Sequence, residues 1–230
     1  MAVYAVSDLH GCLEAYKTIK KILRPDDIVY CLGDCGDRGP QPWETIKAVA
    51  ADKQFIYLKG NHEDMLIKAA KEIIDDEWGS KKQRLLVSNG GGKTLDQLIV
   101  DDMPEEWVKY LQSLPTYTQY TNINGQQIFL CHAGCTDPYG CGLPSDEDLI
   151  WDREHYFDHP RFCGDAIVVH GHTPMVYVAD DLDIKHFDYQ KALCYADGKK
   201  YCIDAGTFFT GISILLNLDT FESICININD

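Results

Sequence analysis

Five short polar clusters, each directly after an apolar run typical of a β-strand, constrain the fold of this chain most. They are Ser7–Gly11, Gly33–Gly39, Gly60–Glu63, Cys131–Gly134 and His170–Thr173. Loops at the carboxyl ends of neighbouring strands converge in open α/β sheets, and ligands bind there. The clusters contain five of the eight histidines, together with aspartate and asparagine. Imidazole, carboxylate and amide groups form a ligand set suited to Mn, Fe, Zn or Mg. The sequence therefore predicts an α/β fold that can bind a metal ion at the carboxyl ends of its strands.

Hydrophobic periodicity predicts alternating strands and helices in the first third of the chain. The expected strands are Val3–Val6, Ile28–Leu32 and Phe55–Leu58. Helices are expected over 12–23, 42–51 and 66–74, because apolar residues there recur at spacings of three and four. This βαβαβα order favours parallel strands joined by crossover helices.

The remainder of the chain predicts a helical insertion followed by strands. Residues 77–93 are polar with a loop at 89–92, and helices are expected at 94–100 and 104–114. The expected strands are 116–121, 127–131, 167–169, 201–203, 212–216 and 221–228, with a hairpin turn at Asn124-Gly125. We therefore expect one domain over residues 1–230, built on two sheets, with a helical insertion at about 75–115.

Charge and composition exclude several classes of protein. The net charge of −15 excludes a uniformly basic nucleic-acid binder and a polybasic membrane-surface protein. The residues before Asp8 contain neither a cationic segment nor a long apolar one, so we expect no signal peptide. No apolar stretch approaches the roughly 18–20 residues of a membrane span. Ten cysteines in 230 residues fall below the ~8–10% typical of disulfide scaffolds. We expect a soluble cytoplasmic protein with reduced thiols and neither nucleic-acid nor membrane partners.

Each cluster taken alone has an ordinary structural explanation. Asn61 is a plausible helix cap, His132 a buried hydrogen-bonded histidine and Arg38 one half of a surface ion pair. Their occurrence in order at five strand ends favours a shared site instead.

The ordered motifs resemble those of the calcineurin-like metallophosphoesterase superfamily. They read Asp8-x-His10-Gly11, Gly33-Asp34-x-x-Asp37-Arg38-Gly39, Gly60-Asn61-His62-Glu63, His132-Ala133-Gly134 and Gly171-His172-Thr173. Within the superfamily they are most similar to the bacterial and bacteriophage serine/threonine protein phosphatases. The resemblance covers essentially the whole chain and implies a four-layer α-β-β-α sandwich around two mixed sheets.

The resemblance implies a centre of two divalent metal ions, with Mn²⁺ favoured over Fe, Zn or Mg. Asp8 and His10 would bind the first metal, and Asp34 would bridge both. The second metal would be completed by Asn61, His132 and His172. Spacing alone permits either His170 or His172 to be the ligand, because residues two apart on an extended segment share a face. The family pattern favours His172 and leaves His170 in a supporting position.

The resemblance also implies catalytic and substrate-binding residues. His62 would be the general acid, oriented by Asp37, and a bridging hydroxide would attack phosphorus directly. Arg38 would bind phosphate through its planar fork. Arg153 is the candidate for a second phosphate-binding arginine, and Asn89 is expected to line the pocket.

The expected function is hydrolysis of phosphoserine and phosphothreonine, with a phosphorylated protein or peptide as partner. The alternative is a symmetrical diadenosine tetraphosphate hydrolase or another small-molecule phosphoesterase. Those tetraphosphate hydrolases typically carry Ala-Arg-Gly and Gly-Asn-His-Asp where this chain has Asp37-Arg38-Gly39 and Gly60-Asn61-His62-Glu63. A binding module of the same fold without catalytic activity is the third reading.

Overall fold

The first of two mixed sheets contains the strands that lead into three of the polar clusters. The computed structural model describes residues 1–135, 144–154 and 166–229. In this sheet the order is β10-β9-β1-β2-β3. The strands are β1 (Val3–Val6), β2 (Ile28–Cys31), β3 (Phe55–Tyr57), β9 (Ile212–Asn217) and β10 (Ser223–Asn227). The parallel strands β1, β2 and β3 align Val6 with Cys31 and Cys31 with Tyr57, so the chain leaves all three at one edge.

The second sheet delivers the other two clusters. Its order is β4-β5-β6-β8-β7. The strands are β4 (Tyr117–Thr121), β5 (Gln127–Cys131), β6 (Ile167–His170), β7 (Leu193–Tyr195) and β8 (Lys200–Cys202). β5, β6 and β8 run parallel, whereas β4 and β7 pair antiparallel with their neighbours. The predicted pair of mixed sheets is confirmed.

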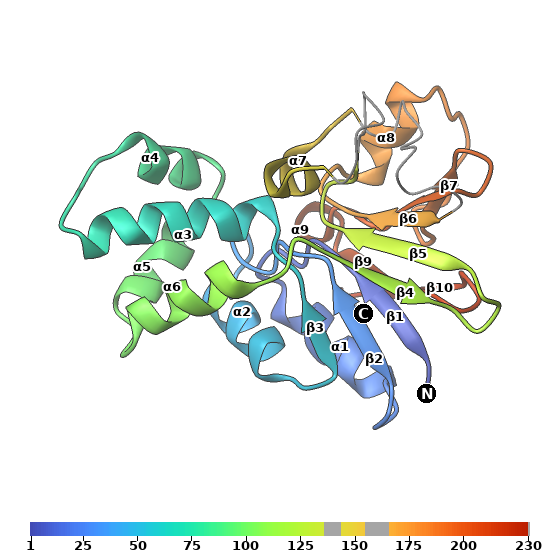
Figure 1. Ribbon diagram of the computed structural model, residues 1–230, viewed down its shortest axis with the longest axis horizontal. Helices are drawn as coiled ribbons and strands as arrows, with labels where there is room; N and C mark the ends of the chain where they lie inside the picture. Colours follow the sequence, from blue (N-terminus) through green and yellow to red (C-terminus); the bar gives the residue numbers. More distant parts are fainter. Residues whose placement is uncertain (136–143, 155–165, 230) are drawn as a thin grey trace.

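Helices cover the outer faces of the sheets and gather at one end of the molecule (Figure 1). They are α1 (Leu13–Ile22), α2 (Pro42–Ala51), α3 (Asn61–Ile74), α4 (Lys81–Ser88), α5 (Gly92–Ile99), α6 (Pro104–Ser113), α7 (Asp146–Trp151), α8 (Met175–Asp181) and α9 (Thr207–Thr210). Figure 1 shows α3, α4, α5 and α6 together at the end away from the second sheet.

Alternation of side chains along the strands produces the four layers. Val3 and Ala5 of β1 point to the core between the sheets, where they meet Leu130 of β5. Phe129 of β5 points the opposite way and packs with Leu149 of α7. The other face of the first sheet packs on α1 and α2. The predicted α-β-β-α sandwich is therefore confirmed.

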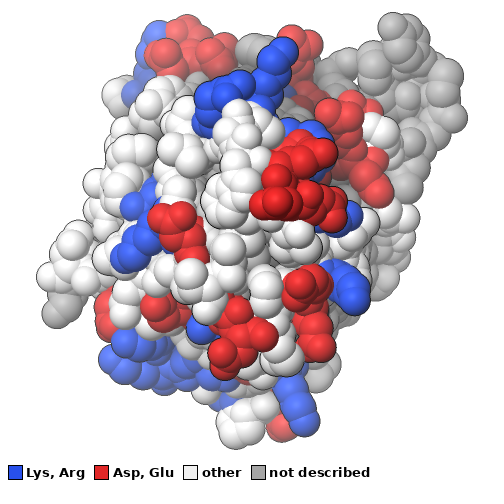
Figure 2. Space-filling model, turned by 90° about the vertical axis from the view of Figure 1, so that its left-hand side faces the viewer, with Lys and Arg blue, Asp and Glu red and all other residues white. Residues whose placement is uncertain are grey.

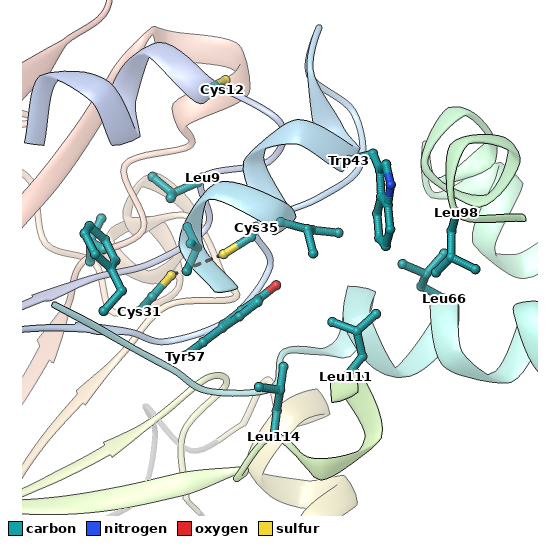
Figure 3. Packing of buried hydrophobic residues seen from close by; sticks show 14 of the residues in the cluster. Leu9, Cys12, Cys31, Cys35, Trp43, Tyr57, Leu66, Leu98, Leu111 and Leu114 are labelled. Atoms are coloured by element: carbon teal, nitrogen blue, oxygen red, sulfur yellow. Dashed lines mark hydrogen bonds between the residues drawn. The ribbon is translucent and has the colours of Figure 1, made fainter. Parts of the chain in front are cut away.

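Buried side chains anchor the loops that follow β1 and β2. Leu9 and Cys35 are fully buried and pack in the same cluster as Trp43 and Leu66 (Figure 3). Cys31 lies beside Cys35, with their Sγ atoms 3.3 Å apart, and the cysteines that the structure describes form no disulfide. A close-packed core restrains displacement of the side chains next to these anchors.

The segment 77–93 differs from expectation, because it contains the helix α4. Its polar sequence lacks a strong apolar stripe, but Ser80 caps it by accepting a hydrogen bond from Gln83 N at 3.1 Å. Leu86 is fully buried and fixes the helix to the core.

At this end of the molecule acidic and basic side chains lie next to one another on the face shown in Figure 2. Among the described residues, no helix combines the length and apolar character needed to cross a bilayer.

Candidate functional site

Asp34, in the loop after β2, lies at the centre of the converging loops. Its Oδ2 atom is 3.7 Å from His10 Nε2 and 3.4 Å from His132 Nε2. It belongs to two groups of buried side chains whose ligand atoms lie within 4.8 Å of one another: His10, Asp34 and His62, and Asp34, His132 and His172. One carboxylate is therefore shared by two potential cation positions.

Asp8 and Asn61 complete the arrangement around Asp34. Asp8 Oδ1 lies 3.7 Å from His10 Nε2, and Asp8 Oδ2 accepts a hydrogen bond from His172 N at 3.0 Å. Asn61 Oδ1 lies 3.0 Å from His132 Nε2 and 2.9 Å from His172 Nδ1. The structure thus brings together all six side chains that the sequence singled out as metal ligands.

The hydrogen bonds of the imidazoles suit coordination of divalent cations. His10 Nδ1 lies 3.1 Å from Gly36 O, and His132 Nδ1 lies 2.9 Å from Leu32 O. A carbonyl oxygen only accepts, so each Nδ1 carries a proton, and in the neutral ring the lone pair of Nε2 would face Asp34 and be open to a cation. His172 Nε2 is buried and finds no hydrogen-bond partner among the described residues. The donors present fit a pair of divalent ions.

His170 faces away from this centre. Its Nδ1 atom lies 3.0 Å from Gly171 O and its Nε2 atom 2.8 Å from Tyr195 Oη. The structure therefore places His172, rather than His170, among the converging side chains.

Burial and mutual charge perturb the site strongly. Burial raises the pKa of Asp8. Burial also acts to raise the pKa of Asp34, but the adjacent His132 and His62 outweigh it and hold that pKa well below its usual value. The pKa of His132 rises to about 10, because attraction to Asp34 exceeds the opposing effect of burial. Buried carboxylates of this kind require positive partners, a role that bound cations can fill.

His62 and Asp37 form a buried pair beside the cluster. His62 Nδ1 lies 2.6 Å from Asp37 Oδ2. Burial disfavours the imidazolium, yet Asp34 and Asp37 outweigh it and raise the pKa of His62. The Arg38 guanidinium donates to His10 Nε2 at 2.7 Å and to His62 Nε2 at 2.9 Å. An imidazole held by a carboxylate and a planar cation therefore lie side by side next to the cluster.

The backbone at the site adopts conformations that L-residues rarely take. Eleven described residues other than glycine have positive φ, and six of them belong to the predicted site: Asp8, His10, Asp34, Asp37, Arg38 and His172. Such conformations cost about 1–3 kcal/mol each and persist where surrounding contacts enforce them. Glycines permit the crowding, because a Cβ atom at Gly60 would collide with Asp34 Oδ1 and one at Gly171 with Asp8 Oδ2.

Glu63, in the first turn of α3, is a supporting residue that sequence reasoning did not identify. Its carboxylate accepts hydrogen bonds from Asp34 N (2.8 Å), Cys35 N (3.0 Å) and Gly60 N (2.8 Å). Tyr57 Oη donates a fourth at 2.6 Å. Glu63 thus ties the loop after β2 to the loop after β3. The glutamate at the third position of a helix was the available signal.

Replacing Glu63 with alanine should destabilise the protein by at least about 3 kcal/mol. Three backbone N–H groups would lose their acceptor, and each buried unsatisfied donor costs about 1–3 kcal/mol. Denaturant unfolding of Glu63→Ala and Glu63→Gln checks this, with the glutamine variant closer to the parent. Equal stability of all three proteins would contradict the structural role of Glu63.

The two remaining residues predicted to bind substrate, Arg153 and Asn89, differ in whether they reach the cluster. Arg153 is exposed just after α7, and its Nη1 atom donates to Thr173 Oγ1 at 3.2 Å, next to His172. Asn89 ends α4 and uses its amide to donate to Leu85 O at 2.8 Å. The amide of Asn89 therefore caps its own helix rather than reaching the cluster.

Comparisons with known proteins agree with this geometry. The family model of the calcineurin-like phosphoesterases matches residues 1–203. The symmetrical bis(5′-nucleosyl)-tetraphosphatase of Pseudomonas syringae pv. tomato is 24% identical over 96% of this chain and 88% of its own length. The enzyme of the same name from Pseudomonas fluorescens is 39% identical over 71% of this chain and 64% of its own. A metallophosphoesterase structure from Sphaerobacter thermophilus shares the fold, with a TM-score of 0.61 at 17% identity, covering 98% of this chain and 86% of that one.

These findings correct the predicted partner. The curated relatives are named for a dinucleotide substrate, a small molecule, and not for a phosphorylated protein. The expectation of a phosphoprotein partner is therefore wrong. It rested on the motifs Asp37-Arg38-Gly39 and Gly60-Asn61-His62-Glu63. The Asp37–His62 pair within them assists departure of any oxyanion and so does not distinguish an alkoxide from a diphosphate.

Proposed function

The chain belongs to the calcineurin-like phosphoesterase family, and from that premise we propose that it hydrolyses symmetrical dinucleoside tetraphosphates such as diadenosine tetraphosphate. The observation that carries this proposal is the pair of arginines at opposite ends of the candidate metal centre. Arg38 contacts His10 and His62, whereas Arg153 lies beside His172. A phosphate chain lying across the centre would meet a guanidinium at each end. The names of the curated relatives support the same substrate class.

The family uses divalent metal ions, and six side chains of this chain would hold them: Asp8, His10, Asp34, Asn61, His132 and His172. When bound, such a pair of ions supplies Lewis-acid activation of water and of the phosphoryl group, and we favour Mn²⁺. Two divalent ions against the two carboxylates leave a local charge of about +2, which attracts a polyphosphate although the whole chain carries −15.

The chain's own groups would bind the substrate and supply a proton. Asp37 holds the His62 ring through Nδ1, so Nε2 is the atom that faces the reacting phosphate. Asp34 and Asp37 raise the pKa of His62 against the effect of burial, and the protonated ring would donate its Nε2 proton to the departing diphosphate oxygen once Arg38 has turned from Nε2 to the phosphate. Arg38 lies against the same Nε2 atom and would turn its fork to the phosphoryl oxygens.

Product analysis tests the proposed substrate class. Diadenosine tetraphosphate incubated with the Mn²⁺-loaded protein should yield ADP as the sole nucleotide, since cleavage between the second and third phosphates gives two equal halves. A mixture of ATP and AMP would contradict symmetrical cleavage. Turnover of p-nitrophenyl phosphate without turnover of the tetraphosphate would contradict the substrate class.

Replacing Arg153 with alanine should raise KM for diadenosine tetraphosphate by about tenfold. A hydrogen bond to a charged group contributes about 1.5–3 kcal/mol, and the exposed position of Arg153 places its effect at the lower end. KM for p-nitrophenyl phosphate, which has one phosphate, should change less than twofold or so. Arg153→Lys serves as the matched variant that keeps the charge without the fork. Equal effects on both substrates would contradict a role in holding the distal phosphates.

A further inference from the structure

The helical segment that follows α3 reaches the catalytic loop through its α4–α5 connection. Gly90 O accepts a hydrogen bond from Arg38 N at 3.0 Å. A Cβ atom added at Gly91 would lie 2.7 Å from Asp37 Oδ2, so only glycine permits this approach. The connection thus packs directly over Asp37 and Arg38.

Thr94, in the first turn of α5, holds the Asp37 carboxylate. Its side chain is fully buried. Thr94 Oγ1 accepts a hydrogen bond from Asp37 N at 3.1 Å and donates to Asp37 Oδ1 at 2.5 Å. The other carboxylate oxygen, Oδ2, receives His62 Nδ1 at 2.6 Å. Because both oxygens are engaged, the carboxylate is fixed in the orientation that holds the imidazole.

This support acts on a strained piece of backbone. Asp37 and Arg38 have φ values of 65° and 60°, in the left-handed region that costs L-residues roughly 1–2 kcal/mol each. α5 is anchored in the core by Leu98, which is fully buried, and by Leu95. The hydrogen bonds that Gly90 and Thr94 form with Arg38 and Asp37 therefore hold the strained loop in place.

We propose that Thr94 is a positioning residue for phosphoester hydrolysis, acting through Asp37 on His62, and that the α4–α5 segment is thereby part of the active site. The inference rests on the proposed function only in that His62 protonates the leaving oxygen; it does not depend on the identity of the nucleotide.

Two substitutions at Thr94 and one matched control separate positioning from general stability. Thr94→Val keeps the shape and removes the hydroxyl, whereas Thr94→Ser keeps the hydroxyl. Thr45→Val removes a different buried hydroxyl, which donates to Gln41 O at 2.7 Å within α2 and its cap. We expect Thr94→Val to lower kcat about tenfold with KM within about twofold, by analogy with the about 10–100-fold loss that follows removal of an outer hydrogen-bond partner of a metal-ligating histidine. Thr94→Ser and Thr45→Val should each retain kcat within about twofold.

A double-mutant cycle with His62→Asn decides how Thr94 acts. In the His62→Asn background the Thr94→Val change should cost less than about twofold, because the residue it supports is gone. An equal loss in both backgrounds, or failure of Thr94→Ser to restore kcat, would overturn the proposal. Measuring the cycle on p-nitrophenyl phosphate as well as diadenosine tetraphosphate separates failure of the substrate class from failure of this inference. A Mn²⁺-loaded protein that turns over neither compound contradicts both.

A readout independent of turnover is the His62 Nδ1 proton in the metal-free protein. Its hydrogen bond to a carboxylate should give a low-field ¹H resonance, identified by its absence from His62→Asn. The resonance should shift or broaden in Thr94→Val and persist in Thr94→Ser and Thr45→Val. An unchanged resonance in Thr94→Val would show that Asp37 holds His62 without Thr94.

Discussion

Replacing Asp34 with alanine should abolish both metal binding and hydrolysis. Asp34 belongs to both groups of converging side chains, with its Oδ2 3.7 Å from His10 Nε2 and 3.4 Å from His132 Nε2. Removal of the shared carboxylate leaves neither position with an adequate ligand set. The loss of kcat/KM should exceed the roughly 10–100-fold that follows loss of an outer partner of a metal ligand.

Elemental analysis after desalting from Mn²⁺ measures the binding half of this prediction. The parent should retain two ions per chain and Asp34→Ala none. Asp52→Ala is the matched control, since Asp52 accepts a hydrogen bond from Tyr16 Oη at 2.9 Å and forms an ion pair with Lys20, away from the candidate site. The Asp52→Ala protein should lose some stability and keep both ions. An Asp34→Ala protein that keeps one tightly bound ion would contradict the bridging role.

Replacing His62 with asparagine should depress kcat strongly while leaving bound metal near stoichiometric. General acid catalysis contributes about 10²–10⁴-fold, and a diphosphate leaving group, less basic than an alkoxide, places the expected loss near 10²-fold. His62 lies in one of the two candidate ligand groups, with Nε2 3.9 Å from Asp34 Oδ2, so metal content must be measured alongside activity.

Asp37→Asn provides the comparison for His62→Asn. It removes the carboxylate 2.6 Å from His62 Nδ1 and should reproduce most of the loss without affecting metal content. If His62→Asn loses metal in proportion to activity, His62 is a ligand and not the acid.

The sequence was informative about the first sheet because its elements alternate regularly. The expected helix at 42–51 coincides with α2, and the expected strand Val3–Val6 with β1. α4 was missed because its stability comes from the Ser80 cap and from Leu86 packing in the core, not from an apolar stripe. β7 was missed because three residues form a strand there only by pairing with β8. Such elements depend on tertiary partners that local periodicity does not contain.

The convergence of the candidate ligands was predictable because they follow strands closely in the sequence, and parallel strands end at a common edge. The choice of individual ligands came from the family resemblance. The supporting residues were not, since their role comes from hydrogen bonds between distant parts of the chain. Thr94 and Asp37 are 57 residues apart, and Glu63 and Asp34 are 29 apart. The left-handed backbone of Asp8, Asp34 and His172 was equally invisible, because aspartate and histidine occur in this region without an obligatory sequence signal.

Anomalous diffraction from crystals grown with Mn²⁺ tests the central claim most directly. Two peaks about 3.5–4 Å apart should flank the Asp34 carboxylate. The first should lie within bonding distance of Asp8 and His10, and the second of Asn61, His132 and His172. A single peak, or none, within reach of these side chains would contradict the account.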